Sequence, residues 1–202
     1  MYQKERMLSG LPYKAWLDGL TEEREACKQK IYEFNLLPPK ERGQIPDLLK
    51  SILGRTGDNL WIEPPFHCDY GWNIEVGENF FANYNLTILD VGKVTIGKNA
   101  QIAPNVSIYT AGHPIHPDSR NSGYEYGIPI TIGDNVWIGG NTVILPGVTI
   151  GDNVVIGAGS VVTKDIPDNA IAVGNPCKVI RTVTEADRNY YYKKTPFDVE
   201  DY

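Results

Sequence analysis

Residues 130–165 read ITIGDN VWIGGN TVILPG VTIGDN VVIGAG SVVTKD, six consecutive blocks that follow one six-residue template. Residues 94–111 read VTIGKN AQIAPN VSIYTA and follow the same template. The third position of every block is aliphatic: Ile96, Ile102, Ile108, Ile132, Ile138, Ile144, Ile150, Ile156 and Val162. The first position is small or β-branched: Val94, Ala100, Val106, Ile130, Val136, Thr142, Val148, Val154 and Ser160. A period of six does not fit a helix, whose apolar face recurs at three or four residues.

This period is typical of short strands separated by sharp corners. The aliphatic third residue points inward, and Gly, Asp or Asn at the following positions turns the chain, because Gly and Asn tolerate positive φ. Three strand–corner units form a triangular coil, and stacked coils pair their strands in parallel and bury each other's faces. The sequence therefore predicts an all-β solenoid, a parallel β-helix. The alternative, an antiparallel sandwich with many turns, is disfavoured by nine matches to one template.

The β-helix is expected over residues 61–180, because 61–92 have the same strand-and-turn texture with a broken period. The interruption at 112–129 begins and ends on the repeat, so we expect a loop extruded from one corner. Such a long loop is usually functional or mobile. It contains His113, His116 and Glu125, which a bare solenoid does not need.

The two ends of the chain differ from the repeat. Residues 1–60 predict a helical cap, with a helix that starts at Thr21 as N-cap and places Ala26 among its apolar residues, and a second short helix over 45–53. Residues 181–202 predict a short C-terminal helix and tail, because Thr184 and Asp187 resemble a capping box.

Composition excludes several classes of protein. The net charge of −6 argues against general binding to nucleic acid or to membrane surfaces. Three scattered cysteines suggest neither a disulfide framework nor a thiolate zinc site. No apolar run has membrane-spanning length, and the first ten residues lack an apolar signal core, so a cytoplasmic location is expected.

Several segments together resemble one family. They are the hexapeptide repeat, the loop TAGHPIHPDSRNSG, the closing VVTKDIPDNAIAVGNPCKVIR, and FHCDYGWNI with NFFANYNLTILD upstream. The chain is similar to the hexapeptide-repeat sugar O-acetyltransferases of the maltose, galactoside and nodulation type, and most to the maltose branch. The resemblance implies a left-handed β-helix, a homotrimer, acetyl-CoA as cosubstrate without a required metal, and active sites between neighbouring subunits. It implies transfer of the acetyl group to a hydroxyl of a sugar such as maltose, glucose or a galactoside.

The resemblance also implies the catalytic residues. His113, within TAGHP, matches the general base that takes the proton of the acceptor hydroxyl, a role suited to a side chain that titrates near neutral pH. Asn83 matches an asparagine near the reacting centre, which could position the acceptor or stabilise negative charge. Gly140 matches the backbone N–H donor to the oxyanion. The family often has serine there, but a main-chain donor survives replacement by glycine.

The resemblance also implies that Asp69, Asn83 and Glu125 lie on the acceptor side. Carboxylates such as Asp69 and Glu125 commonly bind sugar hydroxyls through paired hydrogen bonds. One departure lies near the N-terminus. Some relatives have an acceptor-binding Asp just after an aromatic residue, where this chain reads Tyr13-Lys14-Ala15, and Asp18 is out of register.

The cofactor side is implied in the same way. Pantetheine is expected along the coils past Trp137, Gly140 and Ala158, with Thr163 and Lys164 at the nucleotide end. Lys178 and Arg181 match a basic pair near the phosphates. Lysine at the first position keeps the charge but lacks the bidentate fork of arginine.

Three alternatives stay open at this point. A trimeric β-helix metalloenzyme of the carbonic anhydrase type would use His67, His113 and His116, although these are not spread along successive coils. A non-catalytic scaffold would not need the loop cluster. Acetylation of a different small acceptor, such as an amine, would use the same donor.

Overall fold

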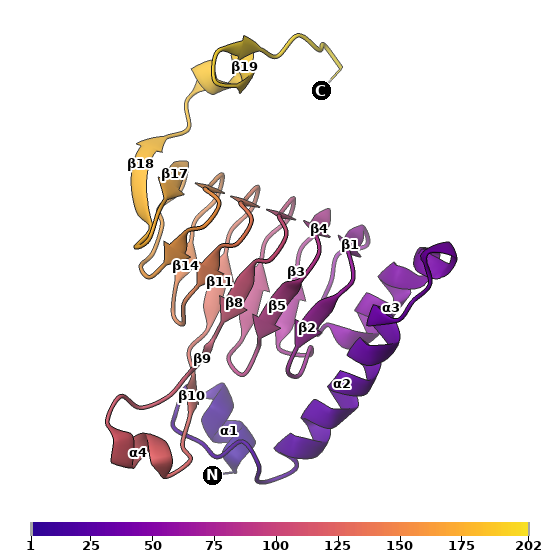
Figure 1. The fold of residues 1–202 in the computed structure, drawn as a ribbon, viewed down its shortest axis with the longest axis vertical. Coiled ribbons are helices and arrows are strands. Elements are labelled where there is room, and N and C mark those ends of the chain that lie inside the picture. Colours follow the sequence, from indigo (N-terminus) through magenta and orange to yellow (C-terminus); the bar gives the residue numbers. More distant parts are fainter. Residues whose placement is uncertain (1, 202) are drawn as a thin grey trace.

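The computed structural model describes residues 2–201 and shows a left-handed parallel β-helix closed at its N-terminal end by helices (Figure 1). Successive coils pair in parallel to form three sheets of seven, five and four strands. The seven-stranded sheet contains, in spatial order, β1 (Leu60–Ile62), β4 (Phe80–Ala82), β7 (Gln101–Ile102), β12 (Trp137–Ile138), β15 (Val155–Ile156), β17 (Ala170–Val173) and β18 (Lys178–Thr182). The five-stranded sheet contains β16 (Val161–Val162), β13 (Val143–Ile144), β8 (Ser107–Tyr109), β5 (Leu86–Leu89) and β2 (Phe66–Cys68). The four-stranded sheet contains β14 (Thr149–Ile150), β11 (Ile130–Ile132), β6 (Val94–Ile96) and β3 (Ile74–Val76).

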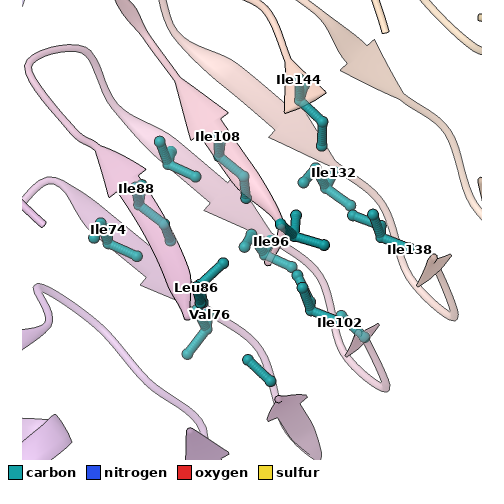
Figure 2. Close-up of a cluster of buried hydrophobic side chains, with 14 of the residues drawn as sticks. Ile74, Val76, Leu86, Ile88, Ile96, Ile102, Ile108, Ile132, Ile138 and Ile144 are labelled. Carbon is teal, nitrogen blue, oxygen red and sulfur yellow. The ribbon is translucent and has the colours of Figure 1, made fainter. Parts of the chain in front are cut away.

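The interior is filled by the columns that the repeat predicts. All nine third-position aliphatic residues are at most 2% exposed, and the nine first-position residues are at most 3% exposed. Figure 2 shows isoleucines from neighbouring coils, including Ile96, Ile132 and Ile144, gathered in this core. The predicted β-helix is therefore confirmed, and its first coil begins with β1 at Leu60.

We expect Ile144→Ala to lower the free energy of unfolding by about 2–5 kcal/mol, because a fully buried aliphatic side chain leaves a cavity that the stacked coils cannot close. Urea unfolding at fixed protein concentration measures the change. Thr131→Ala is the matched control, since Thr131 is exposed on β11 and its loss should cost less than about 1 kcal/mol. Equal losses for both variants would contradict a core built from the third positions.

The coils turn at three edges, each defined by the sheets that it joins. At the asparagine edge, between the four- and seven-stranded sheets, a ladder of side-chain amides runs through Asn79, Asn99, Asn135, Asn153 and Asn169. Each amide donates to the next at 2.8–3.0 Å, and all five residues have φ near +57°. Asparagine suits this edge because it tolerates the left-handed conformation and its amide both donates and accepts.

The other two edges carry the predicted site residues. The Gly140 edge leads from the seven- to the five-stranded sheet and comprises the turns after β1, β4, β7, β12 and β15. The loop edge leads from the five- to the four-stranded sheet and comprises the turns after β2, β5, β8, β13 and β16. The extruded loop leaves the loop edge after β8 on a short antiparallel stalk, β9 (Ala111–Gly112) with β10 (Tyr126–Gly127), and carries α4 (Pro117–Asn121) away from the coils (Figure 1).

The N-terminal helices are α1 (Gln3–Leu8), α2 (Leu20–Asn35), the 3-10 helix η1 (Pro39–Gln44) and α3 (Ile45–Ile52). The second short helix is where the sequence predicts it, but α1 was not expected. The start of α2 was also predicted wrongly: its N-cap is Gly19 with φ of 84°, not Thr21. Its buried face contains Cys27 rather than Ala26, and the Cys27 sulfur lies 3.7 Å from that of Cys68 on β2.

The C-terminal segment turns back on the last coil. β18 pairs antiparallel with β17, in contrast to the parallel coils. The predicted short helix is the 3-10 helix η2 (Glu185–Asn189), and the Asp187 carboxylate accepts a hydrogen bond from the Thr184 N–H at 2.8 Å. A hairpin of β19 (Tyr190–Tyr192) and β20 (Thr195–Pro196) follows. None of the helices within residues 2–201 is long and apolar enough to cross a membrane.

Candidate active site

A pocket of about 290 Å³ opens at the loop edge, between the extruded loop and the N-terminal segment. It brings together three of the predicted site residues: Asp69 from the turn after β2, His113 from the start of the loop and Glu125 from its end. Its remaining lining residues are Ala15, Arg24, Leu89, Val91 and Ala111. Residues far apart in sequence thus form one polar hollow.

Asp69 is held in this pocket by its backbone. The fully buried Asp90 carboxylate accepts hydrogen bonds from the N–H groups of Asp69 at 2.8 Å and Tyr70 at 2.9 Å. Burial raises the pKa of Asp90 to about 6, against the opposing effect of these two N–H donors. Sequence analysis did not single out Asp90, because an Asp at a strand end is an ordinary turn residue.

The charge of Asp69 is balanced by Arg24 on α2. Burial raises the pKa of the Asp69 carboxyl, the Arg24 guanidinium opposes this rise, and the negative charge of Glu125 adds to it. Arg24 Nη1 donates to the Ala15 carbonyl at 2.8 Å and to the Tyr70 hydroxyl at 3.1 Å. The pocket therefore holds two carboxylates, one guanidinium and an imidazole. Arg24 was also missed, since nothing in the helix sequence says which side of α2 faces the loop.

The three histidines lie on separate elements. His113 lines the pocket, whereas His67 is exposed on β2 and His116 is exposed at the N-cap of α4, where its ring accepts from the Asp118 N–H at 3.3 Å. Within residues 2–201 no group of three His, Cys, Asp or Glu side chains is placed to hold a metal ion.

A second set of predicted residues lies at the Gly140 edge: Asn83 follows β4, Gly140 follows β12 and Ala158 follows β15. The Asn83 side-chain oxygen accepts from the Tyr84 N–H at 2.8 Å, which leaves its NH₂ group to donate elsewhere. Among the described residues the Gly140 N–H has no hydrogen-bond acceptor. The five-stranded sheet, one face of the triangular β-helix, separates this edge from the loop edge that carries His113. At about 3.3 Å per residue, about five residues of strand make that separation roughly 16 to 17 Å. One chain therefore does not bring Asn83 and Gly140 to His113.

The predicted cofactor residues are also distributed. Trp137 is 54% exposed on the outer face of β12, and Thr163 and Lys164 are exposed at the loop edge after β16. Lys178 and Arg181 are exposed on β18. Trp137 and Arg181 line a second hollow of about 360 Å³, together with the tyrosines of β19.

Arg181 is already paired in this structure. Its guanidinium donates to both carboxylate oxygens of Asp187, at 2.8 and 2.9 Å, and this contact lowers the pKa of Asp187 to about 2. An anionic ligand at Arg181 would therefore compete with Asp187. This pair could not be predicted from local sequence patterns, because the β18 register and the η2 turn together create it.

The repeat, the capping helices and the loop pocket define a transferase of the hexapeptide-repeat class. The family model "Bacterial transferase hexapeptide (six repeats)" matches residues 129–164, and "Maltose acetyltransferase hexapeptide capping motif" matches residues 6–57. The galactoside O-acetyltransferase of Escherichia coli (strain K12) is 51% identical over 193 residues, which cover 96% of this chain and 95% of the relative. The chain belongs to the hexapeptide-repeat acetyltransferases, in the branch of the maltose and galactoside O-acetyltransferases.

Two solved structures agree closely with this fold. A maltose O-acetyltransferase from Clostridium difficile 630 has 57% identity and a TM-score of 0.90, over 92% of this chain and 99% of that one. A galactoside acetyltransferase in complex with coenzyme A has 49% identity and a TM-score of 0.95, over 98% of this chain and 100% of that one. The resemblance inferred from the sequence motifs is confirmed.

Proposed function

We propose that this protein moves the acetyl group of acetyl-CoA to a hydroxyl of a sugar such as maltose, glucose or a galactoside, with His113 as general base. One observation carries the proposal: His113 shares a pocket with the carboxylates of Asp69 and Glu125 in a chain of this family. Carboxylates accept hydrogen bonds from sugar hydroxyls, and an imidazole beside them can take the proton of the hydroxyl that reacts.

The reaction then needs three further events. The neutral imidazole of His113 removes the hydroxyl proton as the oxygen attacks the thioester carbonyl carbon. The carbonyl oxygen becomes negative, and the free N–H of Gly140 with the amide NH₂ of Asn83 supplies donors for it. When the carbon–sulfur bond breaks, the imidazolium returns its proton to the leaving thiolate. Acetyl ester and coenzyme A are the products, and the base is restored.

We propose that two subunits contribute to each site, in a homotrimer. His113 lies at the loop edge and Asn83 and Gly140 lie at the Gly140 edge, one face of the prism away. A single chain therefore supplies the base and the oxyanion donors at different places. If the loop edge of one subunit contacts the Gly140 edge of the next, both sets meet around one acetyl group.

The direct test is an acetyl-CoA consumption assay across mono- and disaccharides. We expect release of free thiol that depends on a sugar and is lost in His113→Ala. Mass spectrometry of the sugar should show one added acetyl group. Consumption with amines but with none of the sugars would replace the proposed acceptor, and consumption with neither would remove the proposed function.

We expect Lys164→Glu to raise the KM for acetyl-CoA by about 2- to 5-fold at low salt, with little effect on the KM for the sugar, because an exposed lysine contributes about 1 kcal/mol or less to an anionic ligand. The difference should shrink at high salt, since exposed charges are screened. Lys40→Glu makes the same change in charge on η1 and should leave both KM values unchanged. An unaltered KM for acetyl-CoA in Lys164→Glu would remove this residue from the cofactor site.

A further inference from the structure

The N-terminal segment and the end of the extruded loop interlock beside the His113 pocket. Tyr13 and Glu125 form an isolated antiparallel bridge, with N–H···O distances of 2.9 Å from Tyr13 and 3.0 Å from Glu125. Next to it the Trp16 ring lies against Gly123, where a Cβ atom would be only 2.2 Å from the ring. Gly123 also has φ of 84°, so only glycine fits this contact without strain. The bridge fixes the loop backbone without help from side chains.

A side-chain contact is added to this backbone bridge. The Tyr13 ring is fully buried, and its hydroxyl donates to Oε1 of Glu125. Burial and the hydrogen bond to Glu125 raise the pKa of Tyr13 above its usual range, so the hydroxyl stays protonated and remains a donor. A hydrogen bond to a carboxylate is among the stronger ones in proteins. The Tyr13 hydroxyl occupies Oε1 of Glu125, so Oε2 remains available to accept a hydrogen bond from a molecule in the pocket.

The charges near Glu125 explain why its hydrogen bond from Tyr13 matters for the orientation of the carboxylate. Asp69 lines the same pocket and carries the same sign, so the two carboxylates repel each other. Arg24 is the only lysine or arginine among the residues that line this pocket, and within residues 2–201 its hydrogen bonds go to Ala15 and Tyr70 and none to Glu125. Tyr13 is then the donor that keeps the Glu125 carboxylate in the pocket at a fixed orientation. The neighbouring Ala15 offers no polar group of its own side chain.

We infer that Tyr13 is a positioning residue that determines specificity for the sugar, by fixing one oxygen of Glu125 and aiming the other at acceptor hydroxyls. This inference rests on the proposed function, because it assigns Glu125 to the acceptor side of that site. It adds a residue that does not touch the sugar. It also gives a role to the segment where this chain has Ala15 in place of a carboxylate.

Tyr13→Phe tests the inference, since phenylalanine keeps the buried ring and the backbone bridge and removes only the hydroxyl. We expect the KM for the sugar to rise about 10-fold, the scale of a lost hydrogen bond to a charged group, with kcat and the KM for acetyl-CoA within about 2-fold of wild type. Tyr124→Phe is the control: it removes a hydroxyl from the adjacent residue, whose ring faces Lys14, and should change none of the three.

A double-mutant cycle separates this role from a merely structural one. In a Glu125→Ala background the carboxylate is gone, so adding Tyr13→Phe should change the sugar KM by less than about 2-fold. An equal rise in both backgrounds would overturn the inference, as would a Tyr13→Phe variant with wild-type sugar KM. If Tyr13→Phe does not fold, the Glu125→Ala variant alone decides, because an unchanged sugar KM there removes the residue through which Tyr13 acts. Failure of wild type to acetylate any sugar is a different outcome, which overturns the proposed function and this inference with it.

Discussion

His113→Ala should lower kcat by about 10²–10⁴-fold, the usual loss when a general base is removed. The acetyl-CoA dissociation constant and the thermal unfolding midpoint should stay near wild type, because His113 is exposed in the loop and outside the core.

His116→Ala provides the matched control from the same loop. Its ring makes only a local contact at the start of α4, so its loss should leave kcat within about 2-fold of wild type. Turnover near wild type in His113→Ala would eliminate His113 as the base. Metal analysis of the same samples tests the alternative of a histidine metal site, which predicts bound metal in wild type and its loss in the variant.

Mixed trimers of His113→Ala and Asn83→Ala chains should regain activity that neither variant has alone. Loss of a donor to the oxyanion lowers kcat by about 10²–10³-fold, so each variant is expected to be nearly inactive. If His113 of one subunit works with Asn83 of the next, every trimer that contains both variants has one intact site, about a third of its sites. Co-expression with two affinity tags, followed by tandem purification and a kcat measurement, gives the result.

The informative control places both substitutions in one chain and mixes it with wild type under the same tags. About a sixth of the sites in these mixed trimers should be intact if the sites are shared between subunits, whereas sites within single chains would leave about half intact. Light scattering must show a trimer in every sample. Mixed His113→Ala and Asn83→Ala trimers that stay inactive would contradict a shared site.

The core could be predicted from the sequence because one period decides it. A residue such as Ile144 recurs at the third position of its block, and its burial follows from the direction of a strand side chain. Nothing comparable constrains the ends of the chain. The helix α2 begins at Leu20, directly after the left-handed residue Gly19, and Thr21, although a good N-cap type, lies inside the helix.

The candidate site was predicted through motifs, and only in part. His113, Asp69 and Glu125 were identified by resemblance, and the structure places them around one pocket. Arg24 and Tyr13 could not be found this way, since their roles depend on how α2 and the N-terminal segment lie against the loop. Tyr13 and Glu125 are 112 residues apart, and no local pattern sets the register of such a contact.

The sequence spacing between successive asparagines of the ladder gives the number of residues in each coil. Asn59 extends the ladder by one residue, because its amide donates to Asn79. From Asn59 onward, successive asparagines are 20, 20, 36, 18 and 16 residues apart. The strand register locates the variation at one place: across the loop edge the chain takes eight residues over 67–75, 24 over 107–131 and six over 143–149.

The other two edges keep a constant number of residues from coil to coil. Segments can therefore be lengthened or shortened at the loop edge without moving an inward-facing isoleucine. New loops, and with them new pockets, can therefore arise at the loop edge while the stacked coils keep their strand register. A binding loop grafted onto this scaffold should be inserted at the same edge.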